Sequence, residues 1–151
     1  MIEGVAIKEL RQIPDHRGKI GHMLRDDDEI FEKFGEVYFS YCYPGIVKGW
    51  HYHKIQTDNI TVVHGMMKIV LYDMREDSPT HGEVNEFFTG WDKPILIKIP
   101  PGVVHGFSAV GITTAIAVNC CTHSYKHEDP DEYRIHPHDN DIPYDWATND
   151  G

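Results

Sequence analysis

Short apolar segments that alternate with polar residues dominate the chain, and turn-forming residues separate them. The segments are rich in β-branched and aromatic side chains, while Gly, Pro, Asp and His-Gly sequences lie between them. Both features are typical of β-strands joined by tight turns. We expect strands at residues 37–42, 60–63, 67–72, 95–99 and 114–118. Their spacing predicts an antiparallel sandwich or barrel.

Two other segments depart from this strand pattern. Residues 27–34 could form one or two helical turns, because the acidic residues at 26–29 would stabilise a helix N-terminus. The segment from His123 onward has weak periodicity and is rich in Pro, Asp and His. We expect this segment to wrap over the barrel as a loop, and loops often carry functional groups.

Length and charge restrict the classes of protein and partner. The 151 residues suffice for a single domain, residues 1–151, with its own core. A formal net charge of -10 argues against nucleic acid or an anionic membrane as partner, although a local cluster of Lys and Arg could still bind a small anion. No apolar run is long enough for a signal peptide or a membrane span, so we expect a cytoplasmic protein.

Cysteine usage gives no sign of a metal site. Cys42, Cys120 and Cys121 form an odd set without metal-type spacing. We interpret them as reduced residues that lie in or beside the core.

Two histidine-bearing turns carry the candidate chemistry. The first spans residues 45–53 and contains His51 and His53; the second spans residues 99–107 and contains His105. The spacing of Gly45, His51, His53, Asp58 and Gly65 resembles the first motif of the cupin superfamily, with Asp58 where glutamate is usual. His105 after Pro-Pro-Gly resembles the second motif.

The cupin resemblance implies an all-β double-stranded β-helix, or jelly-roll, barrel. In metal-binding cupins the corresponding positions ligate a divalent ion. A set of three imidazoles and one carboxylate suits iron, manganese or zinc. A metal-dependent cupin enzyme that uses His51, His53, Asp58 and His105 is therefore one hypothesis.

A narrower resemblance covers most of the chain. Seven ordered stretches are similar to landmarks of the dTDP-4-dehydrorhamnose 3,5-epimerase family, and they lie at residues 15–18, 45–52, 73–80, 99–107, 122–125, 135–139 and 142–146. Membership would imply a cofactor-free isomerase of polysaccharide biosynthesis, with no bound metal, that inverts C3 and/or C5 of a nucleotide-activated 4-keto-6-deoxy sugar. It would also imply a homodimer with an exchanged N-terminal strand.

The family resemblance assigns roles by position. The C4 ketone of such a sugar acidifies the hydrogens on C3 and C5, so a base can remove one and an acid on the other face can return one. His51 matches the base, Asp139 the carboxylate that orients it, and Tyr125 the acid. His105 would bond the sugar or its enolate oxygen.

Three cationic side chains match positions that would bind the diphosphate. They are Arg17, Lys48 and Arg75, and in the dimer Arg17 would reach the pocket of the partner.

Two departures keep other hypotheses open. His53 stands where the epimerases usually have Gln, and Asp58 aligns with a lysine, so the pocket has lost positive charge. That loss puts the rate or the double epimerisation in question, because a lysine would help to stabilise the enolate. The alternatives are the metal-dependent cupin and a sugar-nucleotide-binding barrel with degraded catalysis.

Overall fold

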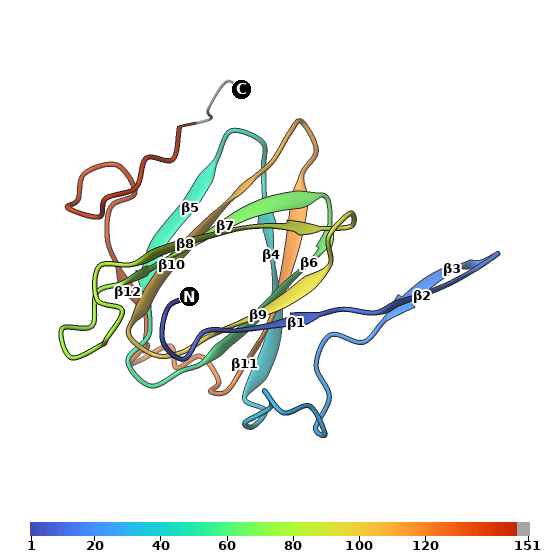
Figure 1. Cartoon of the computed structure of the whole chain (residues 1–151), viewed down its shortest axis with the longest axis horizontal. Coiled ribbons are helices and arrows are strands. Elements are labelled where there is room, and N and C mark those ends of the chain that lie inside the picture. Colours follow the sequence, from blue (N-terminus) through green and yellow to red (C-terminus); the bar gives the residue numbers. More distant parts are fainter. Residues whose placement is uncertain (148–151) are drawn as a thin grey trace.

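The fold of this chain is all-β. A computed structural model describes residues 1–147, in which twelve strands and no helix occur (Figure 1). Two five-stranded antiparallel sheets form the body of the molecule. The first contains, in spatial order, β1 (Ala6–Glu9), β9 (Ile95–Ile99), β6 (Asp58–His64), β11 (Ala115–Cys121) and β4 (Glu36–Cys42). The second contains β12 (Tyr133–Arg134), β5 (Val47–Tyr52), β10 (Val103–Ala109), β7 (Met66–Asp73) and β8 (Val84–Gly90).

A separate hairpin extends from the body. It consists of β2 (Gln12–Asp15) and β3 (Gly18–Gly21), and it projects away from the two sheets (Figure 1). Within this hairpin Ile13 pairs with Ile20, and both side chains are exposed. The body of the molecule therefore leaves this apolar pair uncovered.

The main core lies between the two sheets. Alternate residues of a strand point to opposite faces, so Ile60, Ile97 and Ala117 of the first sheet meet Ile69 and Leu71 of the second. All five are buried. This packing of two sheets confirms the predicted jelly-roll architecture, and all five predicted strands are present, most of them a few residues longer than expected.

A second cluster covers the outer face of the second sheet. Trp50 and Val104 pack there against Trp146 of the C-terminal segment, and the rings of Trp50 and Trp146 lie 4.7 Å apart. Burial of these large side chains fastens the segment to β5 and β10. The predicted wrapping of this segment over the barrel is thus confirmed.

Two local predictions were wrong. Residues 26–30 form turns instead of a helix, because the carboxylate of Asp28 accepts the N–H of Arg25 at 2.8 Å and pairs with Lys8. These contacts close a turn and tie it to β1. The histidine-bearing segments are strands over most of their length, since His51 lies in β5 and His105 in β10.

The three cysteines lie in or beside the core, as the sequence predicts. Cys42, Cys120 and Cys121 are free, and the first and last are buried. Within residues 1–147 the structure contains no helix long and apolar enough to span a membrane.

Candidate active site

Two neighbouring strands bring the central histidines together. His51 of β5 and His105 of β10 are direct partners across the antiparallel pair, and their ring centroids are 4.1 Å apart. His53 follows directly after β5, with its ring centroid 5.6 Å from that of His51. Asp58 is the first residue of β6 and therefore reaches the same place from the opposite sheet. The cluster exists only because both sheets contribute to it.

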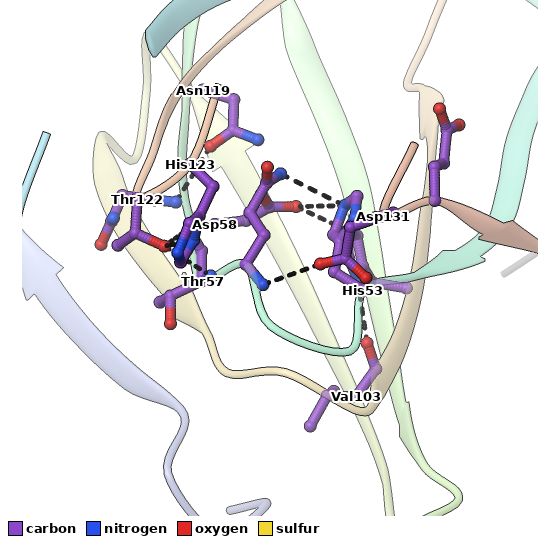
Figure 2. A network of polar contacts seen from close by, with 12 residues as sticks. His53, Thr57, Asp58, Val103, Asn119, Thr122, His123 and Asp131 are labelled. Carbon is purple, nitrogen blue, oxygen red and sulfur yellow. Dashed lines mark hydrogen bonds and ion pairs between the residues drawn. The ribbon is translucent and has the colours of Figure 1, made fainter. Parts of the chain in front are cut away.

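Asp58 is the carboxylate at the centre of this cluster. Its Oδ2 lies 3.0 Å from His105 Nε2 and 3.3 Å from His53 Nε2, while its Oδ1 accepts a hydrogen bond from Gln56 at 2.7 Å. Figure 2 shows Asp58 beside His53. Burial by itself would raise the pKa of Asp58, but the two imidazoles outweigh it and hold that pKa well below 3.8. Burial would lower the pKa of His53, but Asp58 raises it above 6.5.

His51 has a different environment from His53. Burial, followed by the neighbouring His105, lowers the pKa of His51 well below 6.5. Its imidazole is therefore neutral at neutral pH and can accept a proton. The side chains of His51, His53, Asp58 and His105 could also hold a metal ion, because one ligand atom from each lies within 4.8 Å of all the others.

A cavity of about 1070 Å³ opens beside these histidines. His51 and His53 line it, together with Tyr125 from the segment that follows β11. Tyr133 also lines the cavity and stacks on Tyr52, with ring centroids 5.1 Å apart. A cavity of this size can enclose a small organic ligand, and it presents a neutral imidazole and a phenol to that ligand.

Charged side chains of both signs surround the cavity. Its basic residues are Lys48, Lys54, Lys126 and Arg134, and its acidic residues are Glu36, Asp129, Asp131 and Glu132. Of the basic residues the sequence predicted only Lys48, whose Nζ donates to Ser40 Oγ at 2.5 Å. Arg134 could not have been predicted, because its two-residue strand β12 carries no periodic pattern. It is nevertheless the backbone partner of His51 where β12 pairs with β5.

Asp131 fastens the segment that carries Tyr125. Its carboxylate accepts the N–H groups of Lys54, Ile55 and Gln56 at 2.8, 2.9 and 2.9 Å, and its carbonyl accepts a hydrogen bond from His53 Nδ1 (Figure 2). Burial would raise the pKa of Asp131, but these N–H donors lower it below 3.8. Sequence reasoning missed this residue, because it lies in a segment without periodicity.

The predicted site residues divide into two groups. His51, Tyr125 and Lys48 line the cavity, and the buried His105 lies directly behind His51.

The other predicted residues lie elsewhere. The side chain of Arg17 is 76% exposed at the turn of the β2–β3 hairpin and pairs with Asp15. Arg75 binds Asp73 at 2.8 Å and donates to the carbonyl of Glu3. Within residues 1–147 neither arginine is among the cavity-lining residues.

The predicted pairing of Asp139 with His51 does not form in this structure. Asp139 is exposed, and its N–H bonds to His136 Nδ1 at 3.0 Å. Asn140 also donates to the carbonyl of His136 at 2.6 Å, so the turn closes on itself and directs Asp139 away from the cavity. Among the hydrogen bonds of the described residues, none joins Asp139 to His51.

Comparison with known proteins identifies the family. The profile of the dTDP-4-dehydrorhamnose 3,5-epimerase family matches residues 1–150. The chain belongs to this family. It is therefore an isomerase, as its sequence predicts.

Three relatives illustrate how fully this member of the epimerase family matches others. It is 41% identical over 148 residues to the spore coat polysaccharide biosynthesis protein SpsL of Bacillus subtilis, covering 98% of each chain. It is 40% identical to the probable low-salt glycan biosynthesis epimerase Agl13 of Haloferax volcanii, covering 95% of this chain and 89% of the relative. The crystal structure of a dTDP sugar isomerase from Desulfovibrio desulfuricans superposes with a TM-score of 0.92 at 40% identity, covering 99% of this chain and 94% of that one.

Proposed function

We propose that this epimerase-family enzyme inverts C3 and/or C5 of a nucleotide-activated 4-keto-6-deoxy sugar. The observation that carries the proposal is that His51 and Tyr125 line one cavity. His51 takes the proton beside the C4 ketone, and Tyr125 returns a proton from the opposite face. Membership of the family supports this reaction class. So do two relatives, of which one is named a probable epimerase and the other a dTDP sugar isomerase.

The cavity also has groups for the two ends of such a substrate. Tyr133 stacked on Tyr52 offers an aromatic surface to a base or sugar ring. Lys48, Lys54 and Arg134 offer positive charge to a diphosphate. The net charge of -10 and the acidic residues that also line the cavity would repel a diphosphate. Diphosphate binding would therefore depend on these nearby cations.

A homodimer would bring Arg17, a predicted substrate-binding residue that lies away from the cavity of its own chain, to the cavity of the partner. The exposed apolar pair Ile13 and Ile20 needs a covering surface, and a second copy of the chain would supply one. Arg17 at the tip of the same hairpin would then reach the cavity of the partner, as the family resemblance implies. The cytoplasmic location predicted from the sequence stays a prediction.

Incubation in heavy water with dTDP-, CDP- and GDP-linked 4-keto-6-deoxy sugars tests this function. We expect deuterium to enter at C3, C5 or both with at least one of these substrates, because each proton abstraction exposes the enolate to solvent deuterons. Tight binding of a substrate without any deuterium incorporation would instead support a binding barrel with degraded catalysis.

A further inference from the structure

We propose that the hydroxyl of Tyr38 donates a hydrogen bond to the C4 oxygen of the sugar while that oxygen carries the negative charge of the enolate. This inference rests on the proposed epimerisation and adds a further catalytic residue to it. Tyr38 lies in β4, the edge strand of the first sheet.

Tyr38 belongs to the wall of the cavity that the first sheet supplies. Because alternate residues of a strand point to opposite faces, Tyr38 and Ser40 line the cavity, while Phe39 between them is exposed on the other face. His51 lines the same cavity from β5 of the second sheet. A ligand in the cavity therefore meets the imidazole and the phenol from different sheets.

Asn119 of β11 fixes the orientation of the Tyr38 hydroxyl. Its Oδ1 accepts the N–H of Asn59 at 2.9 Å, so its Nδ2 is the atom that faces Tyr38 Oη, at 3.0 Å. An amide nitrogen only donates, so the phenol oxygen accepts here and its own hydrogen points elsewhere. Among the hydrogen bonds of residues 1–147, none has the Tyr38 hydroxyl as donor. Its proton is therefore available to a ligand in the cavity.

Tyr38 also keeps this proton at neutral pH. Burial raises the pKa of Tyr38 above its ordinary value of 10.0, and the negative charge of Asp58 raises it further. The hydrogen bond from Asn119 acts in the opposite direction but is outweighed. The phenol is thus a neutral donor, and it does not compete with His51 as a base.

Proton abstraction creates a negative charge that such a donor stabilises. When His51 takes the proton from C3 or C5, the electron pair of the C–H bond forms a double bond to C4, and the π electrons of the ketone move to its oxygen. A hydrogen bond to that oxygen is stronger in the enolate than in the ketone, so it lowers the barrier. Tyr38 keeps its own proton throughout, and the electrons move back when Tyr125 returns a proton to carbon.

His105, which the family resemblance assigns to the enolate oxygen, is already occupied in this structure. Its Nδ1 lies 3.1 Å from the carbonyl oxygen of Val103, and its Nε2 lies 3.0 Å from Asp58 Oδ2. His105 is also only 1% exposed, and it is not among the described residues that line the cavity. Tyr38, by contrast, combines a free donor with a place on the cavity wall.

Tyr38→Phe tests this role, because the change removes only the hydroxyl. Deuterium exchange and inverted product are followed by proton NMR in heavy water, with the 4-keto sugar on which the wild-type enzyme acts. We expect the kcat values of both to fall together by roughly a hundredfold or more, the cost of removing one donor to an oxyanion. This parallel loss differs from that expected of Tyr125→Phe, which should retain exchange. Binding of the free nucleoside diphosphate, measured by calorimetry, should be unchanged.

Tyr41→Phe is the matched control, since Tyr41 lies on the opposite face of the same strand and is not among the residues that line the cavity. It should leave exchange and product unchanged.

A second variant, Asn119→Asp, keeps the Tyr38 hydroxyl but redirects it. The new carboxylate can still accept the N–H of Asn59, but its other oxygen can only accept, so Tyr38 would donate to it instead of to the sugar. Exchange should therefore fall in this variant too. Circular dichroism establishes that each variant is folded; if Tyr38→Phe does not fold, Asn119→Asp carries the test.

The outcomes separate this inference from the proposed function. Exchange at the wild-type rate by Tyr38→Phe would overturn the role of Tyr38 and leave epimerisation intact. Normal exchange with loss of inverted product would also overturn it, because Tyr38 would then be an acid toward carbon. Absence of exchange by the wild-type enzyme with every substrate would refute epimerisation itself, and the role of Tyr38 with it.

Discussion

The chemistry of single residues in this site is set by their neighbours. His51, His53 and His105 are the same residue type in one cluster, yet burial lowers the pKa of His51 while Asp58 raises that of His53. Of these three histidines, only His51 combines a lowered pKa with a place among the residues that line the cavity, which Tyr125 also lines. This difference supports the proposal that His51 removes the proton.

Variants of His51 and of Tyr125 should therefore lose different steps of the reaction. His51→Ala should lose both deuterium exchange and epimerised product by a factor on the order of a hundred or more, because removal of the proton comes first. Tyr125→Phe removes only the hydroxyl, so it should retain exchange at the substrate carbon while the inverted product falls away. Proton NMR in heavy water follows both quantities.

The same spectra contain the contrary outcomes. Full inversion by Tyr125→Phe would assign the acid to another group, such as Tyr133 or a water molecule. Normal deuterium exchange by His51→Ala would show that His51 is not the base. Tyr43→Phe is the control for loss of a phenol, because Tyr43 is exposed and is not among the residues that line the cavity.

Asp73 shows how one residue stabilises a turn and makes stability depend on pH. Burial by itself would raise its pKa, but hydrogen bonds from Arg75, Ser78 and Thr80 hold that pKa well below 3.8. A depressed pKa adds stability above the unfolded value of 3.8, and this stability is lost as the pH falls toward the lower folded value.

We expect Asp73→Asn to lower the free energy of unfolding by about 2 kcal/mol at pH 7, the scale of hydrogen bonds to a charged group. The difference from wild type should shrink as the pH falls below about 4. Urea unfolding at several pH values measures it. Asp77→Asn, in an exposed part of the same turn, is the control; an Asp73 effect that stays constant down to pH 2 would contradict this explanation.

At the scale of elements, irregular segments position the site. The pairing of β5 with β10 shifts between His105 and Phe107, so that His51 pairs with His105 while Lys48 pairs with Phe107. Lys48 and His51 are three residues apart, and a regular strand would direct them to opposite faces. The shift lets both line the cavity.

The segment that carries Tyr125 depends on Asp131 for its attachment. Asp131→Ala removes the acceptor of three backbone N–H groups, so we expect the free energy of unfolding to fall by about 1–3 kcal/mol. Amide hydrogen exchange of residues 54–56 should also become faster. Mass spectrometry of peptides from this region measures the exchange.

Asp129→Ala is the control, because Asp129 is an exposed carboxylate of the same segment. Equal amide protection in Asp131→Ala and wild type would show that other contacts hold the segment.

At the scale of the whole molecule, the β2–β3 hairpin determines the expected assembly. It projects from the body with Ile13 and Ile20 exposed side by side. Burial of an isoleucine side chain stabilises an interface by about 1.5–3 kcal/mol. An exchanged hairpin would thus account for both the apolar pair and the position of Arg17.

We expect a homodimer at micromolar concentration, measured by light scattering after size exclusion. Ile13→Asp should raise the dissociation constant by about tenfold or more, since about 1.4 kcal/mol corresponds to a factor of ten. Ile112→Asp is the control, because Ile112 is 96% exposed in a different turn. A wild-type monomer at this concentration would refute the exchanged dimer.

The sequence by itself determined the strands, the jelly-roll architecture and the histidines of the site. Residues 95–99 and 67–72 are predictable because β-branched runs between turn residues depend only on local preferences and on the alternation of faces. His51 and His105 each lie in a recognisable motif of neighbouring residues. Such a motif can be identified from the sequence because it depends only on residues that are close to one another along the chain.

Only the tertiary structure decided which of the candidates meet. Asp58 faces His53 and His105 because two sheets pack together, and Asp131 reaches residues 54–56 across more than seventy positions of sequence. Asp139, matched by position to a partner of His51, is turned toward solvent by hydrogen bonds within its own turn. Distances between segments depend on packing and on register shifts such as that in β5, and no periodicity in the sequence encodes them.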